Sequence, residues 1–213
     1  LWNIIVKGGE NKLFETGLNA LGAGLGAVCI VPFLPPLLPE AWPYLAMSCI
    51  CHFTYYICIA EAYKKTDLSF SYTIMRGCAP LLTSLAMLFF GVSLSLGAWC
   101  GVLLLCCGIF CLAGDNARRG ADRSAILLSL RTSFVIMGYT LADGMGARHS
   151  GNAVSYACWI FALNIIPLNA FIFWRHGLNY AGYIRKRALI GIFGGLAGLG
   201  SYGIAIWAMT IAP

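Results

Sequence analysis

Apolar residues run along this chain in long blocks separated by short polar or Gly/Pro-rich breaks. A helix needs roughly 20 apolar residues to cross the hydrocarbon core of a bilayer. After a short opening stretch, the blocks that reach this length cover approximately residues 13–34, 43–62, 67–93, 96–114, 124–146, 152–174 and 187–212. They lack the alternating pattern of transmembrane β-strands. The pattern therefore predicts an all-α fold, a polytopic transmembrane helical bundle.

The composition supports the same fold class. The chain has 213 residues, of which 60% are hydrophobic and only 10% are charged, whereas soluble domains are about a quarter charged. This small number of charged side chains cannot cover a surface that faces water. The bilayer must therefore solvate most of the protein surface. We expect an integral multi-pass membrane protein, located in a bacterial inner (plasma) membrane.

The basic residues are distributed unevenly over the loops between the predicted spans. When the loops are numbered from the first, the even loops hold only Arg148, and the odd loops hold Lys7, Lys12, Lys64, Lys65, Arg118, Arg119, Arg123, Arg175, Arg185, Lys186 and Arg187. An excess of lysine and arginine marks cytoplasmic loops, so we expect the odd loops in the cytoplasm. Because this charge forms no continuous basic face, the net charge of +6 does not indicate nucleic-acid binding.

Several classes of catalytic or metal chemistry find no support in the sequence. The ten cysteines lie almost wholly within apolar blocks, where packing is a more natural role than disulfide bonding. The three histidines are scattered and show no zinc-site spacing. No G-x-x-x-x-G-K-[ST] loop for ATP occurs. We therefore expect no metal and no cofactor. We also expect no catalytic residues, because Ser133, His52 and Asp143 do not converge at one depth in the membrane.

The two halves of the chain are weakly alike. "YYICIAEAYKKTD" from Tyr55 aligns without a gap to "SYGIAIWAMTIAP" from Ser201, which pairs Tyr56 with Tyr202. In the same order, "LWNIIVKGGENK" at the start corresponds to "YTLADGMGARHSGN" from Tyr139. The separation spans five predicted helices, an odd number, so the second unit would be inverted in the membrane. Inverted repeats of this kind are typical of transporters.

Three stretches also resemble a known family. They are "LWNIIVKGGENK", "AEAYKKTDLSFSYTIMRGCAPLL" and "YTLADGMGARHSGN". The first carries the motif W-N-x-x-x-K, and the second carries A-Y-x-x-x-D-L-S-x-x-Y-x-x-x-R-G-x-x-P. With these motifs the chain resembles the EamA-like proteins of the drug/metabolite transporter superfamily over essentially its whole length.

The resemblance implies a carrier of ten helices, made of two inverted five-helix units around a central cavity. Such a carrier moves small metabolites or drugs by alternating access, and export is the direction we expect. The first unit would cover residues 1–115, from the end of helix 1 to helix 5. The second would cover residues 124–213, helices 6 to 8. Compared with the family, the chain resembles a fragment that lacks the start of the first helix and the last two helices.

Arg76 is the most unusual residue of the apolar blocks. It lies about ten residues into its span, hence roughly 15 Å deep, where inserting an arginine costs about 2.5–3.5 kcal/mol. It must therefore contact a solute, a carboxylate such as Asp143 or Glu61, or the carbonyls that Pro80 leaves free. Tyr72, four residues earlier, shares its helix face and the candidate substrate site. Gly77 and Pro80 indicate either a hinge or a static kink.

The other intramembrane charges have a structural and a functional interpretation. Arg131 is expected to extend toward the basic loop before it. Asp143 and Glu61 are candidate proton-coupling carboxylates. The simpler roles are an interfacial pair with Arg148 or a turn for Asp143, and an ion pair with the two lysines after Glu61.

An aromatic, sparsely polar group completes the candidate substrate site, and its members lie at related places in the predicted helices. They are Trp2, Asn3, His52, Tyr55, Tyr56, Glu61, Tyr139, Tyr202 and Trp207. Together they suit amino acids, drugs or other small amphiphiles, although each alone is also a plausible packing residue.

The leading hypothesis is a secondary transporter. A non-transporting membrane scaffold and a membrane-embedded enzyme stay as alternatives, and the expected partners are a small-molecule solute, the lipid bilayer and a second copy of the chain in a homodimer.

Overall fold

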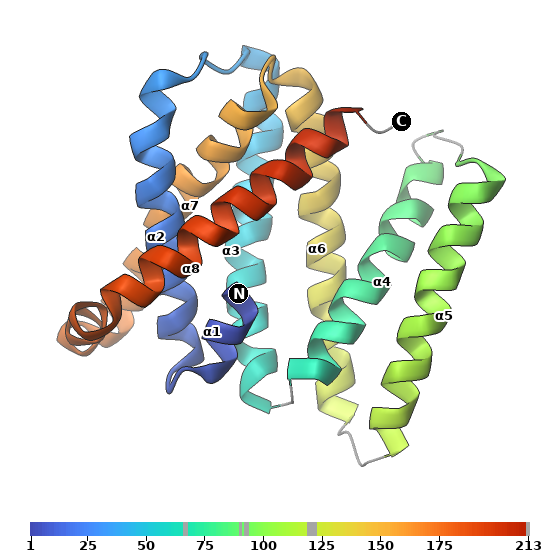
Figure 1. The fold of residues 1–213 in the computed structure, drawn as a ribbon, viewed down its shortest axis with the longest axis horizontal. Coiled ribbons are helices and arrows are strands. Elements are labelled where there is room, and N and C mark those ends of the chain that lie inside the picture. Colours follow the sequence, from blue (N-terminus) through green and yellow to red (C-terminus); the bar gives the residue numbers. More distant parts are fainter. Residues whose placement is uncertain (66–67, 90, 92–93, 119–122, 212–213) are drawn as a thin grey trace.

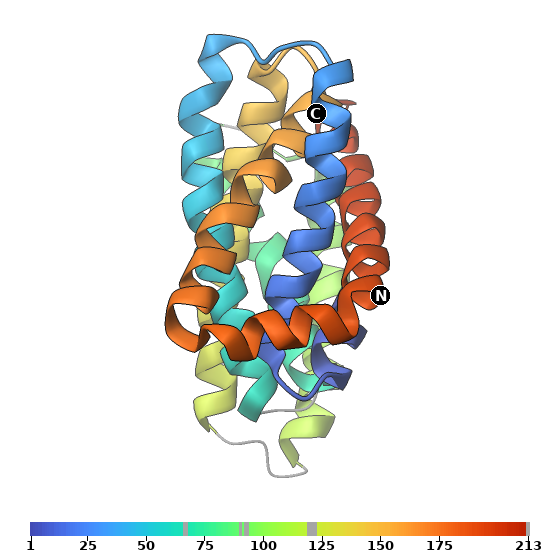
Figure 2. The same ribbon diagram turned by 90° about the vertical axis from the view of Figure 1, so that its left-hand side faces the viewer.

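The fold is a bundle of long helices (Figures 1 and 2). The computed structural model describes residues 1–65, 68–89, 91, 94–118 and 123–211, and these form no β-strand. Two short 3₁₀ turns, η1 (Val31–Phe33) and η2 (Pro39–Ala41), connect α2 to α3. The α-helices are α1 (Trp2–Gly8), α2 (Lys12–Ile30), α3 (Trp42–Lys65), α4 (Leu68–Phe89), α5 (Leu96–Arg118), α6 (Arg123–His149), α7 (Ala153–His176) and α8 (Leu178–Ile211).

Six segments of the described chain are long and apolar enough to cross a membrane. They correspond to α2, α3, α4, α6, α7 and α8, so the predicted class, a helical multi-pass membrane bundle, is confirmed. The predicted span 96–114 corresponds to α5, whose apolar described part, Leu96–Cys111, is shorter. The predicted spans 67–93 and 187–212 include residues 67, 90, 92, 93 and 212, which lie outside the described residues, as do Arg119 and Pro213.

Local sequence explains several helix boundaries. The side chain of Asn11 accepts hydrogen bonds from the backbone N–H groups of Leu13 and Phe14 and so caps α2. Asn152 caps α7 in the same way, through the N–H of Ser155. Gly177, with a φ of 50°, ends α7 in a conformation that favours glycine.

Glycines bring α2 and α8 into backbone contact. A Cβ atom at Gly22 would overlap the carbonyl of Gly191, and one at Gly195 would overlap the backbone of Ala23. Such close approach is a main source of packing energy between helices in lipid. Elsewhere α3 and α4 both pack against α6, and α5 packs against α4. This leaves α8 and the α4–α5 pair on opposite sides of α6, as Figure 1 shows.

α8 begins at Leu178, so a helical arm that was not predicted precedes the predicted span 187–212. Arg187 has non-helical angles (φ −125°, ψ 15°) and divides α8 into an arm and a membrane-crossing part. Figure 2 shows the arm lying across the bundle before the chain turns along it.

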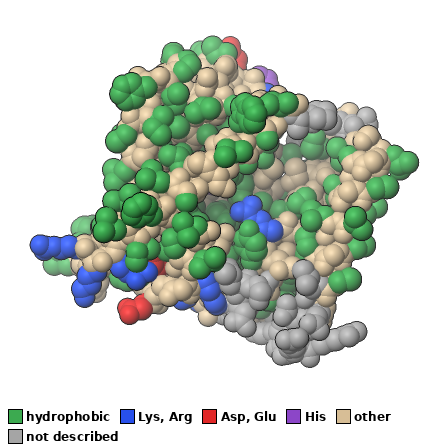
Figure 3. Space-filling view, viewed as in Figure 1, with side chains coloured by type: hydrophobic (Ala, Val, Ile, Leu, Met, Phe, Trp, Pro, Cys, Tyr) green, Lys and Arg blue, Asp and Glu red, His purple; other side chains and the backbone are tan. Residues whose placement is uncertain are grey.

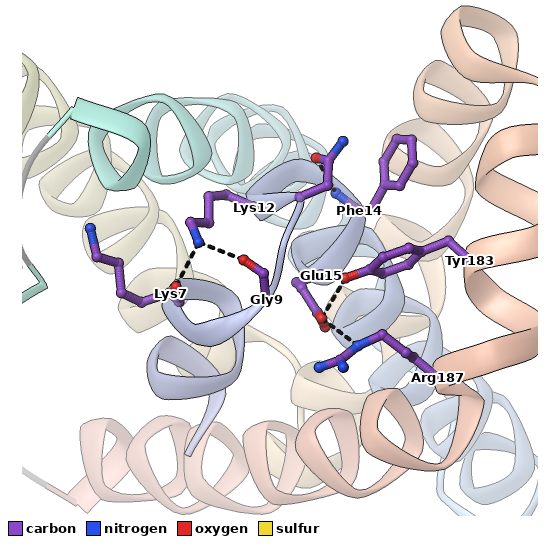
Figure 4. Close-up of polar contacts among 8 residues, drawn as sticks. Lys7, Gly9, Lys12, Phe14, Glu15, Tyr183 and Arg187 are labelled. Atoms are coloured by element: carbon purple, nitrogen blue, oxygen red, sulfur yellow. Dashed lines mark hydrogen bonds and ion pairs between the residues drawn. The ribbon is translucent and has the colours of Figure 1, made fainter.

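A polar cluster on α2 holds this break in place (Figure 4). Glu15 is completely buried, and its Oε1 lies 2.6 Å from Nε of Arg187. The hydroxyl of Tyr183 donates a hydrogen bond to the same carboxylate oxygen, also at 2.6 Å. Tyr183 lies in the arm and Arg187 lies at the break, so one buried carboxylate fixes the arm at the point where α8 turns.

Candidate functional site

A cavity of about 370 Å³ opens into the bundle. Figure 3 shows the hollow on the face between α8 and α4, with Lys or Arg atoms in its centre. Side chains from α1, α3, α4, α6, α7 and α8 line it, together with Leu1. The lining residues are Leu1, Trp2, Asn3, His52, Tyr55, Tyr56, Tyr72, Arg76, Tyr139, Thr140, Phe161, Ala197, Gly198, Ser201, Tyr202, Ala205 and Met209.

Almost every residue predicted for the substrate site lies in this lining. The structure brings together Trp2, Asn3, His52, Tyr56, Tyr72, Arg76, Tyr139 and Tyr202. Glu61 and Trp207 are the exceptions, since both lie outside the lining, and Trp207 is 54% exposed. Trp207 is five positions after Tyr202, which turns the two side chains about 140° apart around the helix axis. It therefore points away from the cavity.

Arg76 lies near the middle of α4 and reaches the cavity as an exposed side chain. Its guanidinium carbon is 5.7 Å from the centre of the Tyr72 ring, a cation–π contact. The two residues are one helical turn apart, so the predicted shared face is confirmed. Further tyrosines from α3, α6 and α8 surround the same charge: Tyr55, Tyr139 and Tyr202.

Neither carboxylate suggested as a partner of Arg76 is paired with it. Glu61 forms an ion pair with Arg131, with Oε2 and Nη2 2.5 Å apart and both side chains about half exposed, at 48% and 49%. The expected pairing of Glu61 with Lys64 is therefore wrong. The Lys65 side chain lies outside the described part, and the extension of Arg131 toward its loop stays a prediction. Because α3 and α6 pack side by side, the opposite charge on the neighbouring helix is within reach.

Asp143 is completely buried inside α6, which continues to His149. Its carboxylate accepts hydrogen bonds from the hydroxyls of Tyr202 and Tyr156. The expected interfacial or turn role of Asp143 is therefore wrong. Arg148 instead donates from Nε to the backbone carbonyl of Met209, at 3.2 Å.

A glycine explains how the Tyr156 ring reaches Asp143. A Cβ atom at Gly146 would overlap the hydroxyl end of the Tyr156 ring, so only a residue without a side chain allows this approach. The Gly-rich end of α6 is thus a packing surface within a continuous helix. The hydroxyl of Tyr202 belongs to a cavity-lining residue, and it separates the buried carboxylate from the cavity.

Ring contacts hold the aromatic wall in a fixed arrangement. His52 stacks on Tyr139 with ring centres 4.4 Å apart, and Tyr139 meets Tyr202 edge to face at 6.2 Å. Trp2 stacks on Tyr56 at 5.9 Å. The Nδ1 atom of His52 lies 3.0 Å from the carbonyl oxygen of Ser48, so this ring is held by α3 itself.

Asn3 is also held in place within the lining. Its side-chain oxygen accepts a hydrogen bond of 3.0 Å from the hydroxyl of Tyr63 on α3. Asn3 is also one of the residues that line the cavity. The short helix α1 is thus tied to α3 beside the cavity.

The proposed weak point of α4 has a packing explanation. A Cβ atom at Gly77 would overlap Ile109, so this glycine lets α5 approach α4. The thiol of Cys106 is 3.7 Å from the carbonyl oxygen of Gly77 in the same contact. Pro80 lies inside α4, which continues to Phe89. Whether Gly77 and Pro80 act as a hinge stays a prediction.

Sequence reasoning missed the part of the lining that α8 contributes beside Tyr202. Ala197, Ser201, Ala205 and Met209 recur every four residues and line one wall. This period places them on one helix face, so the spacing itself was a usable signal. Thr140 and Phe161 carried no comparable signal.

No group of His, Cys, Asp or Glu side chains suitable for a metal ion occurs among the described residues. The site can therefore be described by its cavity, its aromatic wall and the Arg76 charge. Comparison with models of protein families, with curated proteins and with solved structures finds no match to this chain.

Proposed function

We propose that the protein is a secondary transporter that moves small organic solutes across the membrane by alternating access. The observation that carries this proposal is the convergence of aromatic and polar residues from α1, α3, α4, α6 and α8 on one cavity within a membrane bundle. Intramembrane ionisable residues that face a cavity mark substrate pathways in membrane proteins. A volume of about 370 Å³ is within the range of small-molecule sites.

We further propose that the chain is built from inverted repeats, as its resemblance to EamA-like carriers implies. The residues that pair in the two sequence alignments support this idea. Tyr56 and Tyr202 both line the cavity, and so do Trp2 and Tyr139 from the other pair of segments. Related units that face each other across a central site are expected to contribute equivalent positions to it.

The packing suggests which elements move. α2 and α8 contact each other through backbone and glycine, and the Glu15–Arg187 pair anchors the base of α8. α4 and α5 contact the rest of the bundle mainly through α6. We propose that the α4–α5 pair, which carries Arg76, rocks against α8 to open and close the cavity.

Uptake into proteoliposomes tests the proposal. Purified protein is reconstituted, and the accumulation of a panel of labelled amphiphilic solutes is compared with that in protein-free liposomes. Tyr202→Ala, inside the cavity, is expected to reduce uptake, and Trp207→Ala, outside it on the same helix, serves as the matched control. Uptake that equals the protein-free background for every solute, or equal loss in both variants, would argue against a transport cavity at this place.

A further inference from the structure

The cavity contains a cation whose charge no described carboxylate neutralises. The other arginines of the α3–α6 and α2–α8 contacts are matched, Arg131 by Glu61 and Arg187 by Glu15. Asp143 is enclosed by tyrosine hydroxyls and has no exposed surface. Among the described residues, no carboxylate lies within ion-pair distance of Arg76. Among the residues that line the cavity, Arg76 has the one side chain with a formal charge.

The contact that Arg76 does make leaves its hydrogen-bond donors available. In a cation–π contact the ring of Tyr72 faces the guanidinium and accepts none of its directed hydrogen bonds. A guanidinium carries five N–H donors in a planar fork, which matches the two oxygens of a carboxylate. Placing this group in the membrane interior is costly unless an acceptor meets it. The structure thus presents an unmatched donor group in a cavity open to a ligand.

The aromatic side chains that line the cavity suit a ligand with an apolar or aromatic body. Trp2 and Tyr56 form one stacked pair, and Tyr139 and Tyr202 form an edge-to-face pair. Rings arranged in this way offer faces and edges on which a flat apolar group can stack. The Asp143 carboxyl group is completely buried and lies outside the cavity lining, so it does not compete at the cavity surface.

We infer that the cavity takes a small organic anion, with its carboxylate on Arg76 and its apolar or aromatic body against the wall formed by Trp2, Tyr56, Tyr139 and Tyr202. The inference rests on the proposed transport function for its biological meaning, but binding itself does not require transport. Tyr72 is a positioning residue here, because its ring orients the guanidinium.

Calorimetric titration of the protein in nanodiscs with matched probes tests this inference. 3-Phenylpropionate and 3-phenylpropanamide share a ring and chain but differ in charge. Wild-type protein is expected to bind the carboxylate at least about tenfold more tightly than the amide, because a charge-assisted, bidentate contact is lost with the amide. Arg76→Gln is expected to remove this preference and to leave the amide affinity within about twofold.

The amide titration also reports whether the variant is folded. A wild-type protein that binds neither probe, or that prefers the amide, overturns the inference. So does an Arg76→Gln variant that keeps the carboxylate preference, or one that unfolds at the wild-type temperature yet loses both probes alike. Titrations in phosphatidylcholine nanodiscs with and without phosphatidylglycerol separate a solute site from a lipid headgroup site. Loss of carboxylate binding when the anionic lipid is added would assign Arg76 to a headgroup and overturn the solute inference.

A separate measurement distinguishes this inference from the proposed function. Uptake of the permanent cation phenyltrimethylammonium by wild-type proteoliposomes, without 3-phenylpropionate binding, would leave a transporter and remove the anion site. Carboxylate binding without uptake of the permanent anion benzenesulfonate or any other solute would leave the anion site and remove the transport function.

Discussion

The chain has two arginines in very different surroundings on its membrane helices, one at a break in α8 and one within the continuous helix α4. Arg187 lies at the break of α8, where the buried carboxylate of Glu15 and the ring of Tyr183 hold it. Arg76 lies on α4 between Tyr72 and the Gly77–Pro80 stretch, and it faces a cavity. A matched charge fixes the position of a helix, whereas an unmatched charge is available to a ligand. We therefore propose that the Glu15–Arg187 contact stabilises the bundle and that Arg76 serves a ligand.

The largest effect is expected where α2 and α8 touch through backbone. Gly22→Leu would drive its side chain into the Gly191 carbonyl, which cannot move without displacing α8. We expect a loss of about 3 kcal/mol or more in the free energy of unfolding, or a failure to fold. Gly203→Leu on α8 is the matched control, since a Cβ there meets nothing within 4 Å. Thermal unfolding in detergent measures both. Equal destabilisation would show that the glycine contact is not what holds α8.

Glu15→Gln should have the next largest effect, because it leaves Arg187 beside a neutral group in a buried site. Removal of one partner from a buried pair typically costs about 3–5 kcal/mol, and the partial exposure of Arg187 places this case at the lower end. Glu61→Gln breaks the half-exposed pair with Arg131 and is expected to cost less than about 1 kcal/mol. A larger loss for Glu61→Gln, measured in the same melts, would reverse the order of the two pairs.

Tyr202→Phe should have an intermediate effect on stability. It removes the hydroxyl that donates to the buried Asp143 carboxylate and keeps the ring that lines the cavity. An unsatisfied buried acceptor costs about 1–3 kcal/mol. Tyr56→Phe is a suitable control, because the change is the same but Tyr56 lies beside Trp2 rather than Asp143. No difference between the two variants in thermal unfolding would mean that the Asp143 contact contributes little.

The sequence predicted the relation between two site residues correctly where both lie on one face of the same helix. Tyr72 and Arg76 are four residues apart, so their shared face follows from helical spacing, and both reach the cavity. Trp207 shows the limit of alignment with a repeat. It matched the pattern of aromatic residues, but its angle to Tyr202 turns it outward.

Contacts between helices were not predictable in the same way. Spacing along α3 suggested lysine partners for Glu61, whereas its real partner comes from α6. The buried position of Asp143 depends on the approach of Tyr156 to Gly146, which only the three-dimensional packing reveals. The break at Arg187 also follows from a tertiary contact, the ion pair with Glu15.

The most direct measurement compares Arg76→Gln with wild-type protein in benzenesulfonate transport and in thermal unfolding. If Arg76 serves a ligand, we expect the transport rate of Arg76→Gln to fall by about tenfold or more. We expect its free energy of unfolding to change by less than about 1 kcal/mol, because the substitution breaks no buried ion pair. Transport at the wild-type rate, or a destabilisation as large as that of Glu15→Gln, would contradict the account and make Arg76 a structural residue.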